Sequence, residues 1–151
     1  MLLRTVLGTW SLLLLGWWVL SGIVQNGQAW SQETIGLTAR QVVEQWLESY
    51  PQHLNRAVAL TTSSFREGMS QEEWVATRGL FLKGLGLKYV RAKVVNEEFG
   101  GHEAHVMVQA HIVTMMGDQP QDELYILVAN PGGGWLIDQV EVYTESFNRV
   151  P

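Results

Sequence analysis

The chain has 151 residues, of which 46% are apolar and 17% charged, and its formal net charge is −5. This size and composition are typical of one folded domain with an appended segment, and they exclude a disordered chain. The acidic balance, with Lys and Arg scattered along the sequence, argues against a nucleic-acid partner. The sequence contains no cysteine, which excludes disulfides, thiol catalysis and cysteine-ligated zinc.

The first element in chain order is an uncharged apolar run at residues 5–24. Its length suits one helix across a hydrocarbon core of roughly 30 Å, so we predict a retained membrane anchor over residues 1–24. A secretory signal cleaved after Ala29 is the alternative, although its apolar region is typically only about 7–15 residues long. Arg4 precedes the run and should stay in the cytoplasm. We therefore expect residues 31–151 in the periplasm, or secreted if cleavage occurs.

Three helices are expected after a polar linker at residues 25–36. The first begins at a capping-box pattern on Thr38 and ends at Pro51, where a shorter second helix follows. The third opens at another capping box on Ser70 and ends at the glycines at positions 84 and 86.

Four strands are expected in the second half, where Val and Tyr become frequent and segments containing Gly or Pro suit chain reversal. Because short connections make consecutive strands antiparallel, we predict an α+β fold in which helices cover one face of a curved four-stranded sheet. The predicted strands are residues 87–97, 103–115, 122–130 and 134–144. The folded domain then covers residues 37–145, and residues 146–151 form a tail.

The segment FGGHEAHVMVQAHIV at residues 99–113 contains three histidines and looks at first like a metal site. Its apolar residues alternate with the others, however, which predicts a strand. His102 and His105 would then point to opposite faces, and His105 and His111 would share a face but lie about 20 Å apart. One metal ion cannot bind both. The segment predicts neither a metal site nor a cofactor.

His105 and His111 remain candidates for catalysis, together with Asp138 in the last strand. An acid among apolar neighbours would have a raised pKa if buried, and a His–Asp pair across strands could transfer a proton. The side of the strand that carries the two histidines is a solvated sheet surface, a partner surface or the lining of a cavity. The candidate ligand or partner surface comprises Met107, Gln109, Val113, Tyr125 and Trp135.

The order of helices before strands, with LTTSSFREGM after the second helix and GGGWLIDQVEVY near the end, resembles the nuclear transport factor 2-like (NTF2-like) superfamily. The resemblance covers residues 37–145 and is closest to the small members from bacterial envelopes. It implies a cone in which the sheet wraps around a cavity. The superfamily includes isomerases, dehydratases, ligand binders and membrane-anchored assembly subunits, so the fold alone does not fix the function.

We therefore expect a bacterial protein that is anchored in the membrane through residues 5–24 and has no enzymatic activity. It would mediate protein–protein interaction or assembly in an envelope complex, as a homodimer or with another protein. One alternative is a binding protein for a small apolar ligand. Another is an isomerase or dehydratase that uses His105, His111 and Asp138 inside the cone.

Overall fold

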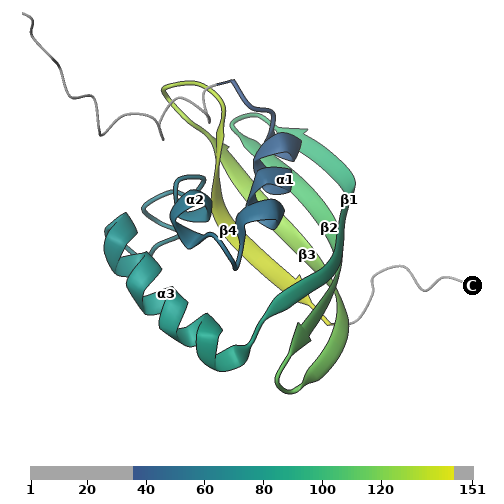
Figure 1. Ribbon diagram of the computed structural model, residues 1–151. Coiled ribbons are helices and arrows are strands. Elements are labelled where there is room, and N and C mark those ends of the chain that lie inside the picture. The colour runs from purple at the N-terminus through teal and green to yellow at the C-terminus, as the bar shows by residue number, and fades with distance from the viewer. Residues whose placement is uncertain (1–35, 145–151) are drawn as a thin grey trace, which may run out of the picture.

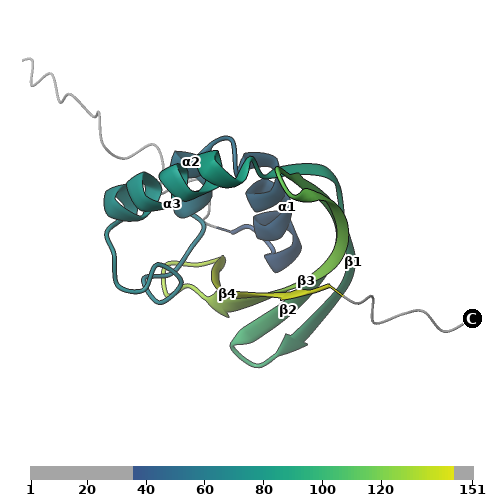
Figure 2. The same cartoon turned by 90° about the horizontal axis from the view of Figure 1, so that it is seen from below.

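The computed structural model describes residues 36–144, and the expected anchor at residues 1–24 and tail at 146–151 lie outside them. Within the described part, no helix combines the length and the apolar character needed to cross a membrane. The described residues form an α+β fold of three helices followed by four strands. The sheet is strongly curved, and all three helices lie on its concave side (Figures 1 and 2).

The helices come first in the chain and the strands second, as predicted. The elements are α1 (Ala39–Ser49), α2 (Leu54–Val58), α3 (Gln71–Leu85), β1 (Lys88–Gly100), β2 (Glu103–Thr114), β3 (Gly117–Ala129) and β4 (Trp135–Tyr143). The strands lie in the order β1-β2-β3-β4, and each pairs antiparallel with the next.

Both predicted capping boxes are present. The Thr38 hydroxyl accepts from the Gln41 backbone N–H at 3.2 Å, and the Gln41 side chain accepts from the Thr38 N–H at 2.9 Å. Ser70 and Glu73 make the same reciprocal pair at the start of α3. These bonds satisfy backbone donors that the first turn of a helix leaves free. The helix starts are therefore fixed by local chemistry.

The third strand differs from the prediction, because β3 begins at Gly117 and not at residue 122. Thr114 pairs with Gly117, so only Met115 and Met116 form the turn between β2 and β3. Pro120 lies within the strand, opposite His111, in a part of β3 that precedes its pairing with β4. Proline is tolerated on such an edge, where no ladder hydrogen bond is lost.

Bulges account for much of the curvature of the sheet. The register of β1 against β2 shifts at Val90 and at Val95, and the register of β4 against β3 shifts at Asp138. An extra residue on one strand bends that strand and increases its twist. The sheet thus curls around α1, which lies inside the bend (Figure 2).

The core lies between α1 and the concave face of the sheet. Every second residue of β2 from Ala104 to Ala110 is buried, which confirms the predicted strand alternation. On α1, Val42, Val43 and Trp46 recur at helical spacing and are buried against this face.

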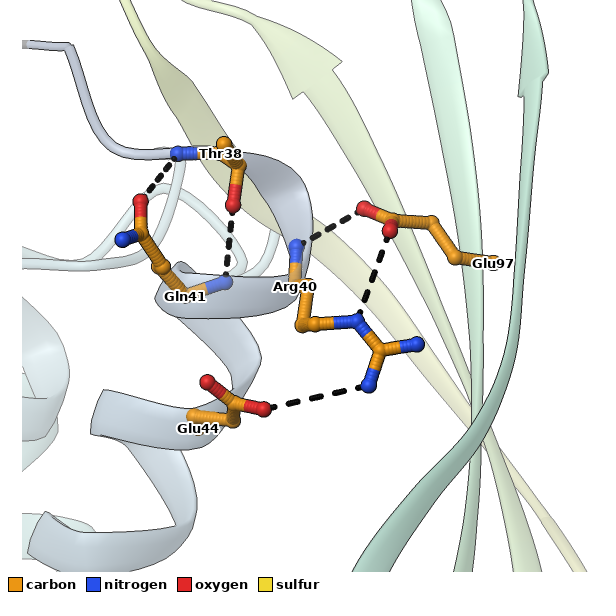
Figure 3. A network of polar contacts seen from close by, with 5 residues as sticks. All are labelled: Thr38, Arg40, Gln41, Glu44 and Glu97. Atoms are coloured by element: carbon orange, nitrogen blue, oxygen red, sulfur yellow. Dashed lines mark hydrogen bonds and ion pairs between the residues drawn. The ribbon is translucent and has the colours of Figure 1, made fainter.

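Polar contacts join the start of α1 to β1 (Figure 3). The Arg40 backbone N–H donates to Glu97 Oε1 at 3.0 Å, and Arg40 Nε lies 3.6 Å from Glu97 Oε2. Arg40 Nη1 also lies 3.9 Å from Glu44 Oε1, one turn further along the helix. A carboxylate at a helix N-terminus is favourable because the free N–H groups carry partial positive charge. Glu97 thus connects the first helix to the first strand.

The chain after α2 runs along the free edge of β4. The Ile137 N–H donates to Leu60 O at 2.8 Å, and the Thr62 N–H donates to Ile137 O at 3.0 Å. Thr61 and Ile137 form a parallel bridge between these two bonds. The segment LTTSSFREGM therefore starts as an addition to the sheet and then leads to α3.

Candidate functional site

A cavity of about 600 Å³ lies between the helices and the concave face of the sheet, and we call it the cone cavity. All four strands, α1, α3 and the segment before α3 contribute to its wall. Its volume falls within the range of roughly 300–1,000 Å³ that is usual for small-molecule sites. The aromatic residues of the wall are Trp46, Tyr50, Phe65, Phe81, Tyr89 and Tyr125.

Trp46 organises the aromatic part of the wall. Its ring stacks on Tyr50, with centroids 4.6 Å apart and planes 13° apart. Phe65 meets the same ring edge to face at 5.4 Å, and Trp74 lies tilted at 6.4 Å. Stacked and edge-to-face pairs add stability beyond simple area burial and fix ring orientation. The aromatic wall is therefore held in place by its own contacts.

Glu123 of β3 is the most buried charged residue of the site, with only 1% of its surface exposed. The Tyr89 hydroxyl donates to its Oε1 at 2.8 Å, and Gln121 Nε2 donates to the same oxygen at 2.5 Å. The Tyr125 hydroxyl donates to Oε2 at 2.6 Å. A buried carboxylate needs such donors to offset its loss of water. Glu123 thus holds three side chains of the sheet in fixed positions.

The buried tyrosines keep their protons over the ordinary pH range. Burial raises the pKa of Tyr89 well above its usual value, and the neighbouring Glu123 carboxylate raises it further. Burial also raises the pKa of Tyr125, with further contributions from Tyr89 and Glu123. Both hydroxyls therefore remain donors, and the Glu123 oxygens remain occupied as acceptors.

Arg78 of α3 approaches the cone cavity from the helical side. Its guanidinium carbon lies 5.9 Å from the ring centroid of Trp74 and 5.6 Å from that of Phe81, both cation–π distances. Burial raises the pKa of Tyr50, although the nearby positive charge of Arg78 acts in the opposite direction. Arg78 is the only Lys or Arg among the residues described as lining the cavity.

Asp138 also lines the cone cavity, where it is the extra residue of the β4 bulge. Its Oδ1 accepts from the Thr62 hydroxyl at 2.6 Å, and the Thr62 hydroxyl accepts from the Phe65 N–H at 3.0 Å. These bonds join β4 to the segment that follows α2. Asp138 therefore has a structural partner within the wall of the cavity.

The two candidate histidines lie on the other face of the sheet. His105 and His111 alternate with the buried residues of β2, and neither lines the cone cavity. His105 Nε2 lies 3.8 Å from Glu103 Oε2, and His111 Nε2 lies 3.0 Å from Asp118 Oδ2, with both partners solvent-accessible. The structure thus brings neither histidine together with Asp138.

The predicted ligand or partner residues divide between two places. Met107, Gln109 and Val113 share the outer face of β2 with the histidines. Tyr125 is fully buried and lines the cone cavity. Trp135, the first residue of β4, packs against Phe99 near the end of β1, with ring centroids 5.8 Å apart. These residues do not form one surface.

Sequence analysis missed Glu123 and Arg78. Glu123, Tyr125 and Leu127 lie at every second position of β3 and therefore share one face. The carboxyl group of Glu123 thus points to the same side as two large buried residues. Arg78 follows Trp74 by one helical turn and precedes Leu82 by another, within the buried stripe of α3. A charged residue in an apolar stripe is the signal that would have indicated both. Within residues 36–144, no three His, Asp or Glu side chains gather as a metal site would require.

No family model matches the sequence, and no curated protein matches it. Several solved structures match the fold. One is a putative calcium/calmodulin-dependent protein kinase type II association domain from Thiobacillus denitrificans, with a TM-score of 0.55 and 10% identity over 74% of this chain and 98% of that one. Another is a ketosteroid isomerase-like protein from Erwinia carotovora atroseptica, with a TM-score of 0.54 and 11% identity over 71% and 93% of the two chains.

A third is a domain of unknown function with a cystatin-like fold from Nostoc punctiforme, with a TM-score of 0.54. Its identity is 14%, over 71% of this chain and 75% of that one. Identities this low carry information about the fold and none about a shared activity. The resemblance seen in the sequence is confirmed at this level, and the chain has the cystatin-like, or NTF2-like, α+β fold.

Proposed function

We propose that this domain binds a small, mainly apolar molecule in the cone cavity. The observation that carries the proposal is the cavity of about 600 Å³ with a rigid aromatic wall and a few fixed polar groups. Binding sites for small molecules combine these features, because the apolar wall supplies affinity and the polar groups fix orientation.

Binding is favoured over catalysis by the state of the acidic groups. Glu123 already accepts three hydrogen bonds. Asp138 accepts a single one, from Thr62, so its case as a base depends on a proton-transfer partner in the cavity. A general base needs a free acceptor within reach of the proton that it removes. The candidate histidines, which could have completed an acid–base pair, lie outside the cavity.

The proposal includes a location. The apolar run at residues 5–24 would anchor the chain in the cytoplasmic membrane and leave the domain on the periplasmic side. In that position the domain would take up a molecule from the envelope and not from the cytoplasm.

An uncharged probe tests the proposal directly. We suggest calorimetric titration of 6-phenyl-1-hexanol into the full chain in lipid nanodiscs, with empty discs subtracted. Ile112→Trp introduces a bulky indole ring at the cavity wall, whereas Gln109→Trp introduces the same ring on the outer face of the same strand. We expect Ile112→Trp to weaken binding about tenfold or more, which corresponds to about 1.4 kcal/mol, and Gln109→Trp to leave it unchanged. Equal affinity in both variants would contradict the proposal, and so would a wild type that binds neither this alcohol nor the carboxylic acid with the same ring and chain.

Protein–protein interaction is a second candidate, supported by exposed apolar side chains near the C-terminal end of α3. Leu80 and Phe81 are exposed there, and the Met115 N–H donates to Leu85 O at 3.0 Å, which brings the hairpin tip alongside. Met115 and Met116 are 76% and 87% exposed. Exposed methionines and aromatic residues are favoured at interfaces. Loss of a crosslinked homodimer in membranes on Met116→Glu would support this candidate, and an unchanged crosslinking pattern would count against it.

A further inference from the structure

Arg78 has a buried donor that the protein leaves unused. Its Nε is buried, and among the described side chains it is the one buried nitrogen or oxygen without a hydrogen-bond partner. Buried donors are paired in the great majority of cases, because an unpaired one loses its water without compensation. An unpaired group of this kind therefore calls for a specific explanation.

The protein does not supply an anion for Arg78 within residues 36–144. No ion pair joins its guanidinium to a described carboxylate, although Glu67, Glu123 and Asp138 all line the same cavity. Glu123 is held by three donors from the sheet, and Asp138 is bonded to Thr62. Glu67 is exposed, so water screens its charge. Arg78 therefore lines the cavity without a charged partner among the described residues, and the side chain that it meets by a hydrogen bond is the uncharged Tyr50.

The setting of Arg78 suits recognition of a planar anion. Trp74 and Phe81 lie within cation–π distance of the guanidinium. Nε and one terminal nitrogen of an arginine form an edge that binds a carboxylate through two parallel hydrogen bonds. Arg78 lines both the cone cavity and a smaller adjoining cavity of about 250 Å³. A group bound at this point would have apolar space beside it.

We propose that the molecule bound in the cone cavity is an amphipathic carboxylic acid, whose carboxylate pairs with Arg78 and whose apolar part lies against the aromatic wall. This inference rests on the proposed function and makes it chemically specific. It assigns Arg78 the role of the group that selects an acid over an uncharged molecule of the same shape.

The test compares 6-phenylhexanoate with 6-phenyl-1-hexanol, which has the same ring and chain without the charge. Calorimetric titrations use the full chain in nanodiscs at neutral pH, and the readout is the ratio of the two affinities. We expect the wild type to prefer the acid by about tenfold, as one charge-assisted bidentate contact would provide. The preference should disappear in Arg78→Met and be smaller than wild type in Arg78→Lys, which keeps the charge but not the planar fork.

Lys83→Met is the matched control, because Lys83 is an exposed cation on the same helix. It should leave the ratio as in the wild type. Equal binding of acid and alcohol by the wild type, or a preference that survives in Arg78→Met, would overturn the inference and leave the proposed function standing. Failure of both probes to bind the wild type would reject the proposed function, and the inference with it. If Arg78→Met does not fold, Arg78→Lys carries the test: a ratio below that of the wild type supports the role of Arg78, and an unchanged ratio overturns it.

Discussion

The two faces of the curved sheet both carry ionisable side chains, but they place them in opposite settings. On the concave face, Glu123 is buried and receives three hydrogen bonds. On the outer face, the side chains of His111 and Asp118 form a pair while 37% and 70% exposed. Exposed pairs contribute little to stability, whereas a buried carboxylate is costly unless every partner is in place. The contribution of an ionisable side chain to the stability of this fold therefore depends on its burial and on its hydrogen-bond partners.

The largest expected effect follows from removing the buried carboxylate. Glu123→Leu would leave the Tyr89 and Tyr125 hydroxyls and the Gln121 amide without their acceptor inside the protein. We expect a loss of about 3–5 kcal/mol in the free energy of unfolding, measured by thermal or denaturant unfolding of the full chain.

Glu98→Leu is the control for that variant, since Glu98 is an exposed acid of β1 that pairs with His105 across the outer face. It should change the free energy of unfolding by no more than about 0.5 kcal/mol. Similar losses in both variants would mean that the two faces do not differ as described.

An intermediate loss in the free energy of unfolding is expected at alkaline pH. The pKa values of Tyr89 and Tyr125 are raised in the folded protein above the ordinary value of 10.0. Above pH 10.0 the unfolded chain therefore releases these protons while the folded chain keeps them, so stability is full below that pH and falls above it. The loss should be about 1.4 kcal/mol for each tyrosine and each pH unit.

Phenolate absorbance provides the measurement for this prediction. Tyr89 and Tyr125 should ionise only together with loss of the circular dichroism signal of the folded chain, and Tyr89→Phe should reduce the slope of stability against pH. Ionisation of all four tyrosines before any unfolding would show that the concave face is open to water.

The smallest change in the free energy of unfolding is expected for substitutions on the outer face of the sheet. His105→Ala and His111→Ala should each change the free energy of unfolding by less than about 0.5 kcal/mol, because both side chains are accessible and their acidic partners are exposed. Binding of 6-phenyl-1-hexanol should also be unaffected. A marked loss of probe binding in either variant would indicate that these histidines belong to the binding site.

The helices were predictable from the sequence because their signals are local. Thr38 with Gln41 and Ser70 with Glu73 lie three residues apart, and each pair caps its own helix whatever the rest of the chain does. The four strands were predicted for the same reason, from alternation and turn residues. The start of β3 was not, because Pro120 suggested a loop and its place on a sheet edge depends on where β4 stops pairing.

The site was less predictable because it depends on contacts between distant segments. In β4, strict alternation places Ile137 and Val140 on opposite faces, but the bulge at Asp138 puts their strand partners Leu127 and Tyr125 on the same buried side. Arg78 was missed because a lone arginine on a helix is ordinarily a solvated residue. Only the packing of α3 reveals that its Nε is buried and unpaired.

The two outer strands of the sheet, β1 and β4, are protected against pairing with strands from other molecules. An exposed strand edge is a template on which another chain can add a strand and begin to aggregate. β1 carries bulges at Val90 and Val95, and the segment from Leu60 to Thr62 occupies the edge of β4 around Ile137. The bulged edge of β1 and the covered part of the β4 edge are thereby made poor templates. We therefore expect the folded domain to resist the addition of a foreign strand at these positions.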